Sequence, residues 1–152
     1  MVFRLDSWFG IPSVDLPRWL LPIIFSLTLF VTWDASRYIV HRVCHDIPAL
    51  WQFHQVHHSA EVLTPLTFHR THPLESLIFE VRGFLVTVVI TGTFFWLFRA
   101  DATDIQLLEV HALGLLCNLA TGNLRHSHIW LGFGKLERWL ISPAQHQMHH
   151  SA

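Results

Sequence analysis

The chain has 152 residues, of which 51% are hydrophobic and 14% charged, and its formal net charge at pH 7 is −1. This length indicates a single domain over residues 1–152, and the near-neutral charge, without a basic run, argues against a nucleic-acid-binding protein. Seven Trp and twelve Phe against one Tyr are typical of a lipid-facing or deeply buried surface, while the two cysteines lack the spacing of a disulfide framework or a thiolate metal site.

The first apolar stretch, residues 19–33, carries no charge, and the acidic residues and prolines before it do not resemble a cleavable signal peptide. The sequence YIVHRVCH follows it. His41 and His45 are four residues apart, so on a continuous helix both imidazoles project from one face, which suits two ligands of one metal ion. Asp34 falls on the same stripe, where it either pairs with Arg37 or accepts a proton from a ligand imidazole and thereby fixes its tautomer.

Residues 54–58 read HQVHH, and the same arrangement of histidines returns as HQMHH at residues 146–150. On a helix we expect the first and fourth residues of each word to share a face, with the fifth about 100° further round, so that one word can contribute to two neighbouring metal ions. With His41 and His45 the words supply eight imidazoles, enough for four ligands on each of two metals. Glu61, just after the first word, either orients one of its histidines or is a solvated surface acid.

The segment FHRTHPLE places two histidines three residues apart and ends with a proline where a new helix could begin, at Pro73. For His72 a place beside the metal site and a place in a polar interfacial loop are both open. For His69 we favour the loop.

Two further apolar stretches follow, at about residues 77–98 and 105–124, the latter broken by Glu109 and His111. A membrane-spanning helix needs about 20 apolar residues, so each stretch is marginal alone. Three of them in a small, charge-poor chain would overfill a soluble core, so we favour an all-α integral-membrane bundle of three to four helices over a soluble three-helix core. His111 lies within the third expected helix, where it either belongs to a functional site or forms a hydrogen bond in the packing of the bundle.

Two membrane crossings between the two words would deliver both to one side of the membrane. Most arginines and lysines fall on that side and Arg99 on the other, so the positive-inside rule predicts a cytoplasm-facing, His-rich helical cap. Four aromatic residues near the words either line an entrance for lipid or anchor the chain at the interface, and we favour anchoring: Trp51, Phe53, Phe68 and Trp130.

The ligand types do not identify the metal, because imidazole suits zinc, copper, iron and nickel alike. No glutamate sits beside these histidines as it does in the HExxH word of zinc hydrolases. A hydrolytic zinc enzyme would therefore need Glu61 or Glu75 as its base, which is the weaker hypothesis. Whatever the metal, ligation requires deprotonated imidazole, so we expect metal affinity to fall as the pH drops through about 6.5.

The series HRVCH, HQVHHSAE, RTHPLE, NLRHSHIWLG and SPAQHQMHHS resembles the fatty acid hydroxylase / sterol desaturase superfamily, from about residue 34 to the C-terminus. This resemblance implies a membrane non-haem di-iron enzyme for O2-dependent hydroxylation or desaturation of a fatty-acyl or sterol C–H bond. It implies two iron ions, with zinc as the alternative metal after purification, and molecular oxygen as cosubstrate. No catalytic residue is expected beyond the metal ligands, which by similarity are His41, His45, His54, His57, His58, His126, His146, His149 and His150. His128, two residues beyond His126, is expected to face away.

The sequence has no recognisable motif for flavin, haem or nicotinamide. The resemblance therefore implies an external electron donor, either a reductase or a cytochrome b5-like or ferredoxin-like protein, besides a lipid substrate. Members of the superfamily usually continue past the last histidine word, so we expect this chain to be a fragment of a longer domain. Two alternatives remain open: a membrane metal-binding protein without oxygenase activity, and a haem-b electron-transfer protein. The second is disfavoured because nearly all histidines lie outside the expected membrane spans.

Overall fold

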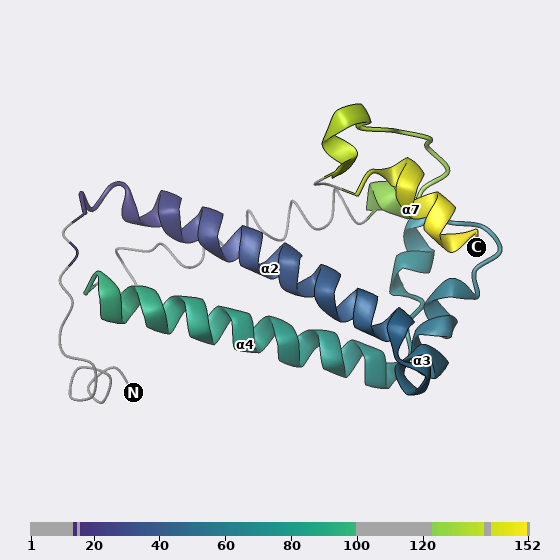
Figure 1. Ribbon diagram of the computed structural model, residues 1–152, viewed down its shortest axis with the longest axis horizontal. Helices are drawn as coiled ribbons and strands as arrows, with labels where there is room; N and C mark the ends of the chain where they lie inside the picture. The colour runs from purple at the N-terminus through teal and green to yellow at the C-terminus, as the bar shows by residue number, and fades with distance from the viewer. Residues whose placement is uncertain (1–13, 15, 100–122, 139–140, 152) are drawn as a thin grey trace. The chain divides into compact units, whose positions relative to one another are not determined.

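The computed structural model describes residues 14, 16–99, 123–138 and 141–151, and within them it contains helices and loops but no strand. The all-α prediction is therefore confirmed. The third apolar stretch, with Glu109 and His111, lies almost entirely outside the described residues. In chain order the elements are α2 (Leu21–Asp46), α3 (Pro48–His58), the 3-10 helix η1 (Pro65–His69), α4 (Pro73–Leu97), the 3-10 helix η2 (Gly134–Arg138) and α7 (Pro143–His150) (Figure 1).

Prolines mark where three of these helices begin, namely Pro48 in α3, Pro73 in α4 and Pro143 in α7. Proline suits the first helical position because its missing N–H would have no partner inside the helix and its φ is already helical. The predicted helix start at Pro73 is thus confirmed.

The chain divides into two compact units, one of Met1–His41 with Ile78–Gly114 and the other of Arg42–Leu77 with Leu115–Ala152. The first unit contains most of α2 and α4. The second contains α3, η1, η2 and α7. The interpretation of residues 1–152 as one family domain stays a prediction.

In the first unit α2 and α4 run antiparallel, side by side (Figure 1). Their core includes Phe25, which is fully buried and meets Phe94 edge to face, with ring centroids 5.1 Å apart. Nearer the other end, Gly83 faces Trp33 so closely that a Cβ on Gly83 would lie 2.7 Å from the indole ring. The glycine therefore sets how near the two helices approach at this level.

Arg82 of α4 is held against α2 by the same tryptophan. Its guanidinium lies 4.6 Å from the Trp33 ring centre and donates hydrogen bonds to the Trp33 carbonyl at 2.9 Å and the Ser36 hydroxyl at 2.8 Å. Asp34 and Glu80 are near enough to attract this cation. The predicted roles of Asp34 did not include this attraction to Arg82.

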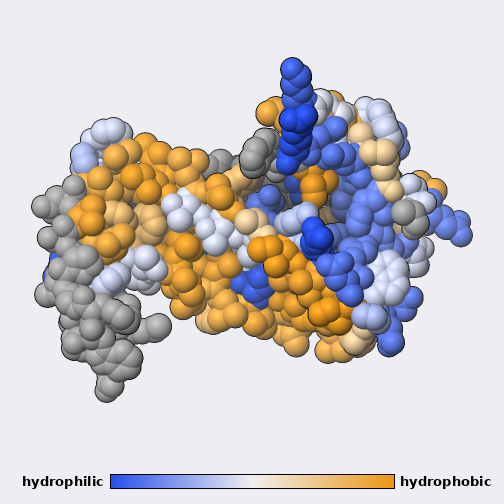
Figure 2. Space-filling view, in the orientation of Figure 1, coloured by the Kyte–Doolittle hydropathy of each residue, from blue (hydrophilic) through white to orange (hydrophobic). Residues whose placement is uncertain are grey.

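Both α2 and α4 are long and apolar enough to cross a membrane. Their 26 and 25 residues correspond to about 39 and 37 Å at 1.5 Å per residue, against about 30 Å for a bilayer's hydrocarbon core. Only 11% of the most apolar window of each helix is buried, and Figure 2 shows mostly apolar residues over their surface. The core helix of a soluble protein would be mostly buried, so these helices favour the membrane over the soluble alternative.

Candidate metal centre

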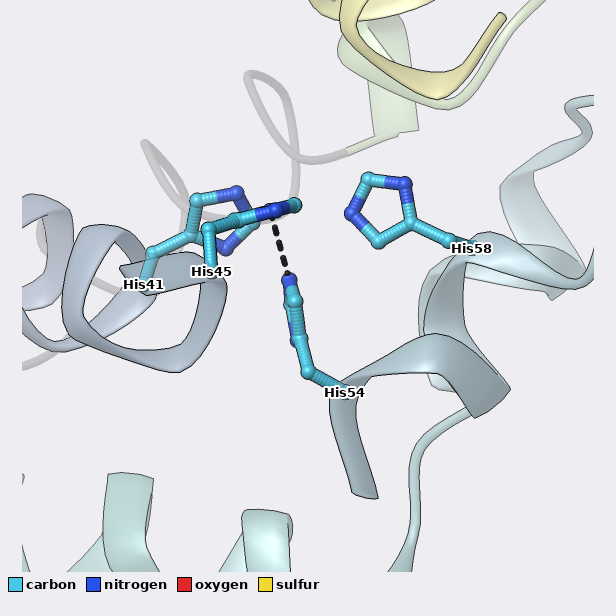
Figure 3. A group of neighbouring side chains, drawn as sticks. All are labelled: His41, His45, His54 and His58. Atoms are coloured by element: carbon cyan, nitrogen blue, oxygen red, sulfur yellow. Dashed lines mark hydrogen bonds between the residues drawn. The ribbon is translucent and has the colours of Figure 1, made fainter. Parts of the chain in front are cut away.

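The first group of imidazoles forms where α2 ends and α3 follows. The helix α2 is continuous from His41 to His45, one turn further on, and α3 contributes His54 and His58. The four rings point toward one another (Figure 3), and one ligand atom from each lies within 4.8 Å of the others. Two of these atoms, Nε2 of His45 and Nε2 of His54, are 3.1 Å apart.

The second group joins α3 to the C-terminal part of the chain. It consists of His57, His126, His146 and His150, whose ligand atoms again lie within 4.8 Å of one another. The Nε2 atom of His146 is 2.9 Å from Nε2 of His126 and 3.2 Å from Nε2 of His150. The two histidine words are thus brought together, as predicted.

These separations fit metal ligation. Two nitrogens that each lie about 2.1 Å from one ion, at 90–110° to each other, are about 3.0–3.4 Å apart. Of the three nitrogen pairs above, those at 3.1 and 3.2 Å fall in this range and the one at 2.9 Å lies just below it. The donor set is purely imidazole in both groups, so either could hold a first-row transition metal.

The assignment of the histidines of each five-residue word to the two groups differs from the prediction in one respect. A single word does serve two groups, because His54 and His58 enter the first group and His57 the second. However, the first and fifth residues stay together, not the first and fourth. Four residues along a helix rotate the side chain by about 40° from the starting direction, whereas three residues leave it about 60° away. His146 and His150 repeat this pairing.

His149 belongs to neither group of mutually close ligand atoms among the described residues. Its ring centre lies 4.5 Å from that of His45 and 4.8 Å from that of His58, so it lies beside the first group. Its ligand role, like those of the other eight histidines, stays a prediction.

The start of α7 is fixed by Ser142, whose side chain is fully buried. The hydroxyl accepts the N–H of Gln145 at 3.2 Å, which caps the helix, and donates to Oε1 of Glu137 at 2.7 Å. The same carboxylate oxygen accepts the N–H of Phe133 at 2.9 Å. These bonds, that of Ser142 foremost, lower the pKa of Glu137 below its ordinary value.

One turn into α7, Gln147 attaches the helix to the loop that carries His126. Its amide donates to the carbonyls of Ser127 at 2.9 Å and Ile129 at 2.8 Å. These contacts hold His126 and His146 in one local framework.

A buried carboxylate supports the first group. Oε1 of Glu75 lies 2.7 Å from Nδ1 of His54, and both side chains are almost completely buried. The sequence pointed to Glu75 only as a base for the hydrolytic alternative and missed this contact. The available signal was the RTHPLE segment, since a helix that starts at Pro73 carries Glu75 in its first turn. Glu61, the other acid considered, is exposed and fits the surface alternative.

The remaining histidines have local surroundings. Nδ1 of His72 accepts the N–H of Leu74 at 3.2 Å at the start of α4, and its ring packs on Phe53. His69 is exposed, as expected, although it is the last residue of the 3-10 helix η1 and does not lie in a loop. His128 is exposed too and so faces away as predicted, although it lies in a bend and not in a helix.

Two of the four aromatic residues contact imidazoles of the two groups, and a third, Phe53, packs on His72. The ring centre of Trp51 is 5.1 Å from that of His45, and the ring centre of Phe68 is 5.6 Å from that of His126. Trp130 is 66% exposed, as an interfacial anchor would be.

Burial favours the neutral form of four imidazoles outside the long helices. Desolvation, with smaller contributions from neighbouring histidines, lowers the pKa of His58 to about 2 and that of His150 to about 3. The same causes lower the pKa values of His146 and His149. Neutral imidazole is the form that ligates metal, so no proton has to leave these rings before an ion binds at neutral pH.

Comparison with known proteins agrees with this geometry. The family model described as fatty acid hydroxylase matches residues 26–152. Alkylglycerol monooxygenase of Homo sapiens is 27% identical to this chain, over 80% of this chain and 24% of its own length. Ornithine lipid hydroxylase OlsE of Rhizobium tropici is 25% identical, over 86% of this chain and 35% of its own length. Methylsterol monooxygenase 1 of Rattus norvegicus is 31% identical, over 72% of this chain and 39% of its own length. The chain thus spans well under half the length of these relatives.

No solved structure gave a significant match. The family match begins within α2 and continues to the last residue, and so includes all eight histidines of the two groups. The chain therefore belongs to the fatty acid hydroxylase family.

Proposed function

We propose that this chain forms the metal-binding part of an integral-membrane, lipid-modifying oxidoreductase. Its reaction is the O2-dependent hydroxylation or desaturation of a C–H bond in a fatty-acyl or sterol lipid at a His-ligated di-iron centre. The observation that carries this proposal is the pair of neighbouring four-histidine groups, to which the word at residues 54–58 contributes three ligands. By their names, the relatives act on alkylglycerol, ornithine lipid and methylsterol, which supports a lipid substrate.

The described residues divide the work of binding. One ion would be held by His41, His45, His54 and His58, and the other by His57, His126, His146 and His150. His149, beside the first group, supplies a ninth ligand. When bound, the iron ions supply the activation of O2 that oxidation of an unactivated C–H bond needs.

Aromatic side chains cover part of the imidazole surface, which would help to keep water from the bound metals. Trp51 covers His45 and His58, with ring centres 5.1 and 5.4 Å away, and Phe68 lies against His126. A dry site strengthens electrostatic interactions and prevents side reactions with solvent. The lipid chain would approach from the bilayer, with the histidines on the cytoplasmic side and electrons supplied by an external donor protein.

The test is metal analysis combined with product analysis. The full chain is purified in detergent, loaded with Fe²⁺, and incubated with a membrane lipid extract, ¹⁸O2 and a chemical reductant. We expect about two irons per chain, and a lipid that has gained one ¹⁸O atom or lost two hydrogen atoms. The matched control is the double variant His54→Ala/His146→Ala, which removes one ligand from each group and should form no product.

Three results would contradict the proposal. Bound iron without O2 consumption or a lipid product would leave a metal-binding protein without oxygenase activity. A Soret band in the purified protein would instead indicate haem-b. If no metal bound after loading, the proposed di-iron centre would be wrong.

A further inference from the structure

Glu75 is buried with a single hydrogen-bond partner among the described residues. Its residue is 3% exposed, Oε1 lies 2.7 Å from Nδ1 of His54, and Oε2 has no hydrogen-bond partner in the described part of the chain. A buried carboxylate is costly unless positive charge or hydrogen bonds compensate it. Among the described residues its side-chain contact is with His54.

The contact bears on which nitrogen of His54 can ligate a metal ion. Nε2 of His54 faces the imidazoles of the first group, so ligation through Nε2 leaves the proton on Nδ1, which then donates a hydrogen bond to Oε1 of Glu75. The lone pair of His54 is then on Nε2. That atom points into the first group, where it lies 3.1 Å from Nε2 of His45.

Glu75 lies near the N-terminus of α4. It lies in the first turn of a 25-residue helix, where the partial positive charge of the helix N-terminus stabilises an anion. Glu75, His54 and His45 also lie in the same compact unit, so their arrangement does not depend on how the two units are placed.

We propose that Glu75 is the positioning residue of the first metal site, acting through His54. It holds the His54 ring with Nε2 toward the ion, and its negative charge compensates part of the charge that a dication brings into a buried site. This inference rests on the proposed metal centre. A carboxylate that orients a ligand imidazole in this way typically contributes 10- to 100-fold to metal affinity.

The test measures metal affinity, not turnover. Wild-type protein and Glu75→Gln are stripped of metal and titrated with Fe²⁺ or Co²⁺ against a competing chelator. We expect one of the two ions to bind about 10- to 100-fold more weakly in Glu75→Gln, with the other unchanged. The Co²⁺ absorption spectrum should change for that ion alone. Glu61→Gln, which neutralises an exposed acid of the same unit, should match wild type.

A double-mutant cycle separates positioning from a general structural role. If Glu75 acts through His54, Glu75→Gln has no further effect on affinity in a His54→Ala background. An equal effect in both backgrounds would overturn the proposal. So would wild-type affinity for both ions in Glu75→Gln. Failure of wild type itself to bind metal would instead defeat the proposed function.

A measurement on unaltered protein covers the case in which Glu75→Gln does not fold. Long-range ¹H–¹⁵N NMR of metal-free wild type, with His54 assigned by its absence in His54→Gln, reports which ring nitrogen carries the proton. The proposal requires the proton on Nδ1. A proton on Nε2 would overturn it.

Discussion

His57 and His58 are adjacent in the chain, yet they enter different groups of imidazoles. The reason is the 100° step between consecutive residues of α3, which points one ring toward His126 and the other toward His45. At the scale of the residue, the assignment of each histidine to a group is therefore the property to test.

Paired substitutions should show this division. His57→Ala and His126→Ala remove ligands from one group, so the double variant should lose the same single metal as either alone. His57→Ala/His58→Ala should lose both metals, because it damages both groups. Elemental analysis after loading measures this, with His128→Ala as the exposed control. Retention of one metal in His57→Ala/His58→Ala would refute the assignment.

The lowered histidine pKa values predict how the metal-free protein responds to acid. The unfolded chain takes up protons near pH 6.5, whereas His150 and His58 in the folded chain remain neutral down to about pH 3 and about pH 2. Between these limits the unfolded state binds more protons, so the free energy of unfolding falls as the pH falls. We expect a lower thermal unfolding midpoint at pH 5 than at pH 7.

Circular dichroism of metal-free protein in detergent measures this midpoint. The double variant His58→Gln/His150→Gln should show a smaller pH dependence, and His128→Gln, at an exposed position, the wild-type dependence. A midpoint that is equal or higher at pH 5 would contradict the expected neutral state of the cluster.

At the scale of the element, the α2–α4 pair depends on a close approach at Gly83. A methyl group there would lie 2.7 Å from the Trp33 ring, which also stacks on Arg82. Gly83→Ala should therefore push the helices apart or displace the indole, at a cost of about 1–3 kcal/mol typical of overpacking. Gly92→Ala is the matched control in the same helix, because a Cβ there meets no atom of the described residues within 4 Å beyond the backbone of its own helix.

Thermal unfolding in one detergent compares these two variants. We expect a lower midpoint for Gly83→Ala and a wild-type or slightly higher one for Gly92→Ala, since alanine is the better helix former. Equal behaviour would mean that the helices do not pack at Gly83.

At the scale of the whole molecule, the main prediction is that α4 crosses the membrane. Ser76 lies in its first turn and Arg99 just beyond its last residue, and both are exposed. In a chain with Cys44 and Cys117 replaced by alanine, we expect Ser76→Cys and Arg99→Cys to react with a membrane-impermeant maleimide from opposite sides of oriented vesicles. Ser76→Cys should react from the cytoplasmic side, and labelling of both from one side would favour the soluble alternative.

The sequence alone determined the properties that depend on local order and composition. Helical spacing already places His41 beside His45, and a proline opens the helix that carries Glu75. The long apolar stretches identify α2 and α4 as candidate spans, because a membrane helix is recognisable from length and composition. The chemistry of the site was also predictable, since imidazole ligands are identified by residue type.

Tertiary structure decided which histidines meet and what supports them. Spacing alone could not show that His57 joins His126 and is separated from His54. This grouping depends on how α3 packs against segments some 70 residues away. The contact of Glu75 with His54 was equally beyond the sequence. An acid in a helix's first turn is ordinarily a solvated, dipole-stabilising residue, and only burial against α3 turns it into the partner of a ligand.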